Sequence, residues 1–147
     1  MLVGVGERRK RKRKRKWMPV THTISRPARL VIALAKDQVS TGDILNYLVE
    51  IHEAGAGTYR KIFDMRGAHG TIPLIELRRI ATRAASFAEA APTGPLAIIV
   101  ATDAHSDLAR LFAYAAAPAK RPVRVFRELH IARAWLDSLD EEKGAAG

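Results

Sequence analysis

Two hydrophobic patterns alternate along the chain after Met18, and this alternation restricts the fold more than any other feature. Short runs rich in β-branched and apolar residues predict strands, whereas apolar residues at every third or fourth position predict helices. Strands are expected at 21–25, 29–37, 59–65, 96–101 and 121–128. Helices are expected after Ser40, after Pro73, at 106–117 and at 131–139. The predicted order is therefore β-β-α-β-α-β-α-β-α.

This order predicts an α/β fold with a mostly parallel sheet, because helices that alternate with strands act as crossovers between parallel neighbours. The first strand is the exception, since only "RPA" at 26–28 separates it from the second, as in an antiparallel hairpin. A chain of 147 residues, 48% of them hydrophobic, is expected to bury one core, in a single domain at 18–139. The polar ending at 140–147 is expected to be a tail.

Two helices carry further local signals. Ser40 is expected to cap the first helix, because "STGD" places Asp43 three residues after a capping hydroxyl. The last helix is expected to bury a face that includes Trp135 in the core. By helical spacing, that inner face would consist of Ile131, Ala134, Trp135 and Leu139.

A basic run dominates the charge of the chain. Nine of its 25 Lys and Arg residues lie at 8–16, and with Glu7 this run supplies +8 of the net charge of +10. So many like charges cannot pack together, so residues 1–17 are expected to form a disordered basic tail. As a functional element, the tail would bind the phosphate backbone of a nucleic acid, or an anionic membrane surface.

A second interpretation of the run is favoured. Every residue from Gly6 to Lys16 is Gly, Glu, Arg or Lys, the amino acids encoded by codons made only of purines. A purine tract just before Met18 is what a bacterial ribosome-binding site gives when it is translated by mistake. We therefore expect the natural start at or near Met18, and nucleic acid as a partner only if the tail is real.

The composition excludes several classes of protein. The absence of cysteine rules out disulfides and thiolate zinc sites and is consistent with a reducing cytoplasm. The longest apolar run, "LAIIVA" at 96–101, is far shorter than the roughly 20 residues of a membrane helix. The expectation is a cytoplasmic protein with no membrane span, no metal and no cofactor.

Polar side chains gather where the third and fourth strands are expected to end. Ligands of open α/β sheets bind beyond the carboxyl ends of the strands. In this chain, those ends are "DMRGAHGT" and "TDAHSD". The candidate ligand- or partner-binding residues are therefore Asp64, Arg66, His69, Thr71, Asp103 and His105.

Each candidate also has a structural explanation. An aspartate that ends a strand commonly bonds loop amides, and Arg66 could hold an anion or simply pair with Asp64. Asp103, His105 and Asp107 alternate like possible metal ligands, but residues just before a helix are more often caps. The Walker, nucleophile-elbow and H-E-x-x-H motifs are absent, so no catalytic residue is assigned.

Three segments together resemble the SpoIIAA-like, STAS-type proteins of bacteria. They are "YRKIFDMRG", "GPLAIIVATDAHSDLARLFAYAA" and "RPVRVFRELHIARAWL". The resemblance covers nearly all of 18–139, and it is specifically to an uncharacterised branch related by fold to anti-sigma-factor antagonists and CRAL-TRIO lipid-binding domains. It implies a small α/β domain that binds a protein partner or a small apolar or anionic ligand without catalysis.

One departure from the family pattern affects this expectation. Anti-sigma-factor antagonists carry an Asp-Ser-Ser/Thr-Gly stretch in which a serine accepts phosphate, whereas this chain reads "DMRGAHGTIP". Asp64 matches the aspartate, and Thr71 is only the nearest hydroxyl. The leading hypothesis is a regulatory or interaction domain that works through the loop after the third strand and the adjoining helix face. The alternatives are a carrier with an apolar cavity of a few hundred Å3 and an enzyme built on Asp64, His69 and His105; a homodimer is left open.

Overall fold

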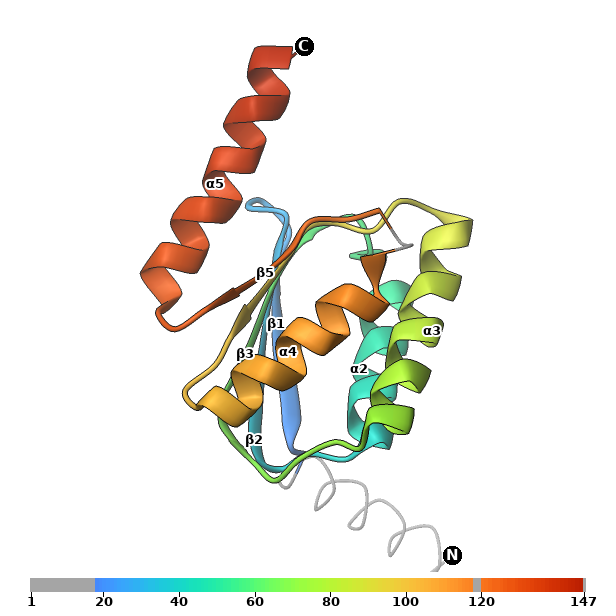
Figure 1. Ribbon diagram of the computed structural model, residues 1–147. Helices are drawn as coiled ribbons and strands as arrows, with labels where there is room; N and C mark the ends of the chain where they lie inside the picture. Colours follow the sequence, from blue (N-terminus) through green and yellow to red (C-terminus); the bar gives the residue numbers. More distant parts are fainter. Residues whose placement is uncertain (1–17, 118–119, 147) are drawn as a thin grey trace, which may run out of the picture.

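The structure is a computed structural model that describes residues 18–117 and 120–146. The basic tail expected at 1–17 lies outside these residues. Within them, five strands form one sheet and follow one another in chain order (Figure 1). The predicted α/β class is confirmed. The strands are β1 (Val20–Ser25), β2 (Leu30–Gln38), β3 (Arg60–His69), β4 (Leu96–Ile99) and β5 (Val123–Phe126).

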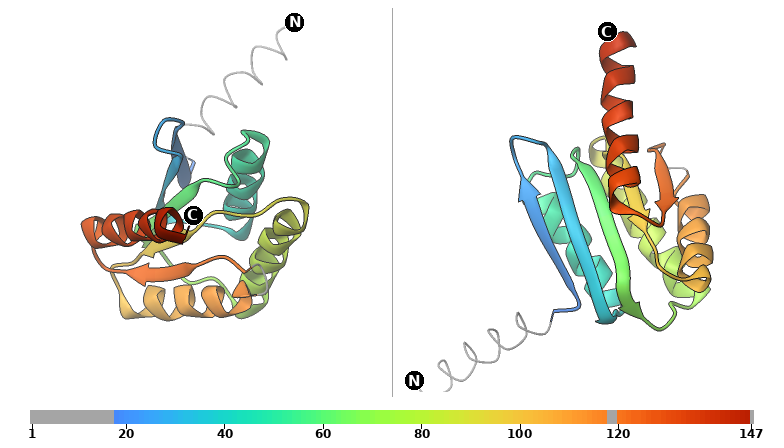
Figure 2. Two further views of the ribbon diagram at one scale, coloured as in Figure 1. Left: turned by 90° about the horizontal axis from the view of Figure 1, so that it is seen from above. Right: turned by 90° about the vertical axis from the view of Figure 1, so that its left-hand side faces the viewer.

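The pairing of the strands is also as predicted. β1 pairs antiparallel with β2, and each later pair is parallel. The helices lie in two layers, one on each face of the sheet (Figure 2). One layer consists of α2 (Thr41–Glu53), α3 (Leu74–Ala90) and α4 (Asp103–Ala115), and the other of α5 (Leu129–Ala146).

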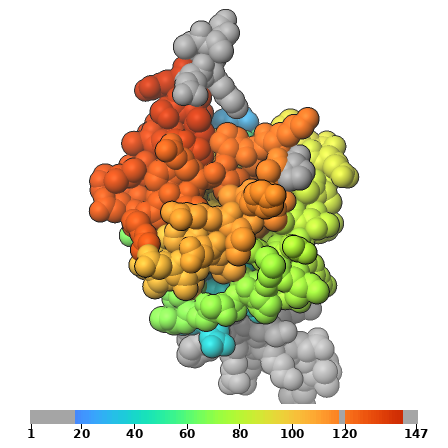
Figure 3. Space-filling model, in the orientation of Figure 1, coloured from blue at the N-terminus to red at the C-terminus, as the bar shows by residue number. Residues whose placement is uncertain are grey.

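Both faces of the sheet carry apolar side chains. Under α2, the buried cluster includes Tyr47 and Ile51 with Val31, and under α4 it includes Ala109 with Ile98. On the other face, Ala132 and Leu136 of α5 pack on residues of β2, β3 and β4. The side chains of α3 and α4 form a continuous surface over their face (Figure 3).

The predicted capping box at α2 is confirmed. The Asp43 backbone amide donates to Ser40 Oγ at 3.1 Å, and the Ser40 amide donates to Asp43 Oδ2 at 2.8 Å. Two otherwise unpaired backbone donors are satisfied in this way. The cap fixes where α2 begins and therefore which of its side chains face the sheet.

β3 is longer than expected. The segment from Arg66 to His69, expected to be a loop, belongs to the strand and pairs with the end of β2 after a register shift between Leu34 and Lys36. The shift breaks the two-residue alternation near Gly67, so the pattern that marks a strand ends earlier than the strand itself. Asp64 therefore lies inside a strand rather than at its end.

The last helix differs from the prediction in two ways. It continues to Ala146, so most of the segment expected to be a polar tail is helical. Its buried face is centred on Ala132 and Leu136, whereas Ile131 is 49% exposed and Ala134 is also exposed. Trp135 is half-buried and packs against Phe126, with the ring centroids 5.5 Å apart. Among the described helices, none has the length and apolar character needed to cross a membrane.

Candidate functional site

Asp64 and Arg66 form a pair on the α5 side of the sheet. They alternate along β3 with Phe63 and Met65, which face the other helices. Arg66 donates from Nε to Asp64 Oδ1 at 3.0 Å and from Nη2 to Oδ2 at 2.8 Å. Burial raises the pKa of Asp64, but the hydrogen bonds and charge of Arg66 outweigh it and hold the pKa below its ordinary value. The guanidinium of Arg66 is thus occupied within the fold.

His69, Thr71 and His105 lie near one another on the opposite side of β3, where they line a small cavity of about 30 Å3. His105 is buried, and its Nε2 lies 3.2 Å from the Gly70 carbonyl oxygen. Because a carbonyl only accepts, Nε2 carries the hydrogen. His105 therefore ties the start of α4 to the segment that precedes α3.

Asp103 is exposed at the start of α4 and accepts a hydrogen bond from Arg127 Nη2 at 2.6 Å. The six predicted residues consequently fall into three separate groups on two faces of the sheet. Among the residues the structure describes, no group of His, Asp and Glu is arranged to hold a metal ion. The cap at this helix is Thr102, whose hydroxyl accepts from the His105 amide at 3.1 Å.

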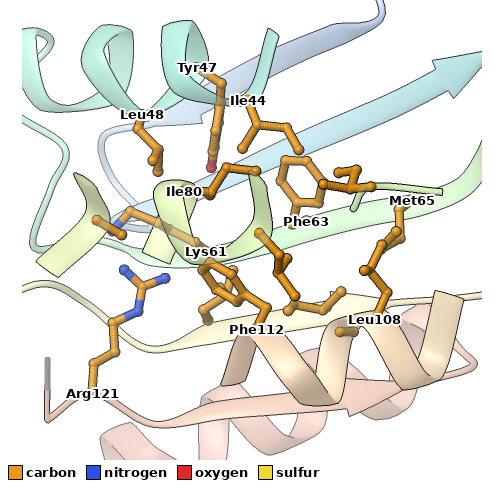
Figure 4. A pocket seen from close by; sticks show the side chains of 16 residues that line it. Ile44, Tyr47, Leu48, Lys61, Phe63, Met65, Ile80, Leu108, Phe112 and Arg121 are labelled. Atoms are coloured by element: carbon orange, nitrogen blue, oxygen red, sulfur yellow. The ribbon is translucent and has the colours of Figure 1, made fainter. Parts of the chain in front are cut away.

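A different site lies between the sheet and helices α2, α3 and α4. This apolar cavity has a volume of about 90 Å3 (Figure 4). Side chains from every surrounding element reach it, including Phe63 from β3, Ile80 from α3 and Phe112 from α4. Two of the lining residues, Lys61 and Arg121, carry charge, and they lie at the same end of the cavity.

Four polar side chains meet at that end. Lys61, Tyr47, Arg121 and Thr93 all line a second cavity of about 30 Å3, which shares much of its wall with the first. Lys61 is only 5% exposed and donates from Nζ to the carbonyls of Gly57 at 2.6 Å and Tyr59 at 2.8 Å. The Tyr47 hydroxyl, the Thr93 hydroxyl and Arg121 Nε are buried without a hydrogen-bond partner in the described residues.

These contacts perturb the protonation of the cluster. Burial, and to a smaller extent the charge of Arg121, lowers the pKa of Lys61 to about 7. Burial also lowers the pKa of Arg121, partly offset by Tyr47, and burial raises the pKa of the Tyr47 phenol. The cluster is therefore a set of buried or half-buried donors, and no described carboxylate forms an ion pair with Lys61 or Arg121.

Two backbone segments hold the cluster in place. The Gly94 amide donates to the Gly57 carbonyl at 3.0 Å, and the Lys61 amide donates to the Pro95 carbonyl at 2.8 Å. The loop around Thr93 is thereby fixed beside the start of β3. On its outer side, the same loop borders a polar groove of about 320 Å3, which Arg29 and Arg60 also line.

Sequence reasoning missed this cluster. The available signal was the two-residue spacing of Lys61, Phe63 and Met65, which places the lysine on the same face of β3 as two large apolar side chains. Since both faces of β3 are covered, period-two alternation alone does not show which face has the cavity. Arg121 and Thr93 lie in connecting segments, where hydrophobic periodicity gives no information. No protein-family model, curated protein or solved structure matches this chain.

Proposed function

We propose that this chain is a STAS-like domain that binds a small ligand between its sheet and helices α2, α3 and α4. The supporting observation is the apolar cavity of about 90 Å3. Protein interiors are close-packed, and ligand sites are typically concave and mostly apolar, so a partly open pocket of this kind among large apolar side chains favours a binding site. The antiparallel first strand and parallel remainder of the sheet support the STAS-like assignment.

The size of the cavity limits the ligand. It is smaller than the few hundred Å3 anticipated for a carrier, and smaller than an engineered cavity of about 150 Å3 that holds benzene. The buried part of the ligand would therefore be a short alkyl group or a similarly small apolar fragment.

A binding role is proposed instead of a catalytic one because the candidate acids and bases have structural partners. Asp64 is held by Arg66, Asp103 by Arg127, and His105 lies on the Gly70 carbonyl. A cytoplasmic location is part of the proposal and rests on the absence of cysteine from the sequence.

The proposal is tested by titrating the full chain, labelled with ¹⁵N, with 1-butanol and following amide shifts. Ala84 of α3 lines the cavity, so Ala84→Leu should fill it and abolish the shifts of residues around it. Ala90→Leu, at an exposed position of the same helix, is the matched control and should leave binding unchanged. If butanol causes no localised shifts in the native chain, the cavity is only a packing defect.

A second candidate function is docking of a protein partner on the first turn of α3. Leu74 is 49% exposed and Ile75 is 76% exposed, and both lie close in the chain to Thr71. Exposed large apolar side chains that neighbour one another favour a contact surface. A partner captured from the host by the native chain should be lost with Ile75→Glu and retained with Leu129→Glu on α5. Equal capture by both variants would remove this surface from consideration.

A further inference from the structure

Four hydrogen-bond donors gather at one end of the cavity, among apolar side chains such as Leu48 and Phe87. Lys61 comes from β3, Tyr47 from α2, Thr93 from the loop before β4 and Arg121 from the segment before β5. None of the described residues that line either cavity is Asp or Glu. Of the described residues that line the two cavities, His52 of α2 is the remaining titratable one, and those contributed by α3 and α4 are apolar.

Part of the hydrogen-bonding capacity of these groups is not used within the described residues. Tyr47 is 5% exposed, and its hydroxyl has no partner; the same holds for the buried Thr93 hydroxyl and Arg121 Nε. Lys61 Nζ has three hydrogens and uses two of them on carbonyls. Buried polar groups are nearly always paired, because an unpaired one keeps the full cost of leaving water.

The charges of Lys61 and Arg121 also favour an anion at this place. A buried cation is ordinarily paired with an anion, yet here Lys61 and Arg121 lie close enough to act on one another. Among the described residues, no carboxylate lies within 4 Å of either. An anion placed between them would compensate both charges and accept from the two hydroxyls.

The space available selects among anions. The second cavity, of about 30 Å3, adjoins the apolar cavity of about 90 Å3, and Tyr47, Lys61 and Arg121 line both. A planar carboxylate with two oxygens suits the small space better than a phosphate with four, and an arginine side chain can bind it through two hydrogen bonds. A carboxylate there would direct the rest of its molecule into the apolar cavity.

We propose that Lys61, Arg121, Tyr47 and Thr93 hold the carboxylate of a small monocarboxylic acid whose short apolar chain occupies the adjoining cavity. This inference rests on the proposed function and names the class of its ligand. The simplest alternative occupant of the second cavity is an ordered water, which could bridge several of the same donors.

The experiment compares four probes by NMR titration of the full chain at pH 6.5: butyrate, acetate, 1-butanol and inorganic phosphate. Butyrate should bind at least about 10-fold more tightly than butanol, because butanol brings no negative charge and only one acceptor oxygen to these donors, whereas a carboxylate brings a charge and two oxygens. In Arg121→Met this ratio should fall close to one while butanol binding persists. Arg124→Met, an exposed arginine on β5, is the control and should keep the full preference.

Tyr47→Phe is the second variant and guards against misfolding of Arg121→Met, since it removes only one oxygen. Tyr47→Phe should weaken the binding of butyrate severalfold and leave the binding of butanol unchanged. Equal binding of butyrate and butanol to the native chain would overturn the carboxylate assignment but leave the proposed function standing. Tighter binding of phosphate than of butyrate would also overturn it.

Two further outcomes separate the inference from the function on which it rests. If butyrate and acetate bind equally tightly, the donor cluster binds carboxylates but the apolar cavity has no role. If no probe shifts the amides around the cavity, both proposals are overturned and water satisfies the donors.

Discussion

Gly94 lies so close to the backbone carbonyl of Tyr59 that a β-carbon at position 94 would overlap its oxygen. The nearest atoms all belong to the backbone of Thr58 and Tyr59, so no side-chain rotation relieves the overlap. Gly94→Ala should therefore lower the free energy of unfolding by more than about 2 kcal/mol, the range of substitutions that force backbone to move. Urea unfolding measures this directly.

Gly42→Ala is the matched control for that substitution. Gly42 lies in the first turn of α2, where an added β-carbon would meet only Ser40 Oγ, at 3.7 Å. Alanine in a helix is favoured over glycine, so this change should stabilise the chain by about 0.5–1 kcal/mol. Similar losses for both variants would show that the contact between Gly94 and Tyr59 does not constrain the loop.

Lys61 should make stability rise with pH between about 7 and its ordinary pKa of 10.5. In this interval, the unfolded chain keeps a proton that the folded chain has released, so unfolding becomes costlier by at most about 1.4 kcal/mol per pH unit. Below pH 7, both states hold the proton, and the cost of the buried charge is fully present. The groups facing Lys61 are Tyr47 and His52 of α2 and Arg121.

The measurement is urea unfolding at pH 7, 8 and 9 for the native chain and for Lys61→Met. In Lys61→Met, the free energy of unfolding should rise less steeply with pH, because the contribution of Lys61 is missing. Lys36→Met, at an exposed position on β2, should keep it. Identical slopes for all three chains would mean that Lys61 stays protonated throughout this range.

Arg66→Ala should destabilise the fold because it leaves Asp64 buried without its strongest partner. The loss should be about 1–2 kcal/mol at pH 7, moderated by the solvent exposure of Arg66. The pKa of Asp64 is lowered in the folded state, so its contribution is present above about pH 4 and disappears as the pH falls through the folded pKa. The loss of stability caused by Arg66→Ala should therefore become smaller at acid pH. Arg79→Ala, in an exposed pair with Glu76, should cost less than about 0.5 kcal/mol.

Leu136→Ala should cost about 2–5 kcal/mol because Leu136 is fully buried between α5 and the sheet. Ile131→Ala should cost less than about 1 kcal/mol, since Ile131 is half exposed and alanine favours the helix. Thermal unfolding of the two variants distinguishes the observed face of α5 from the one expected from sequence. The reverse order of losses would restore the sequence-based assignment.

The fold class was predictable because its signals are local. Ser40 and Asp43 mark the start of α2 by a hydrogen-bond pattern within four residues, and "LAIIVA" contains a strand buried on both faces. The buried face of α5 was only partly predictable. Helical spacing is compatible with more than one buried face on the same helix. Whether Ile131 or Ala132 is buried depends on which sheet residues lie opposite.

The cavity and its donors were not predictable in this way. Lys61 and Arg121 are 60 residues apart and meet only because β3 lies two strands away from β5 across β4. The candidates chosen from sequence are neighbours in the chain instead. Asp64 and Arg66 pair with each other, as the structural alternative allowed, because residues two apart on a strand share a face.

The order of the strands also bears on how the chain folds during synthesis. Each strand pairs with the one made just before it, so every partner is already present when a new strand leaves the ribosome, and the contacts formed are short in sequence. The helices of one layer are completed along the way, whereas α5 arrives last. A nascent chain without α5 would leave the apolar face around Ile62 and Ile99 uncovered. Transiently exposed apolar surface of this kind is what chaperones bind.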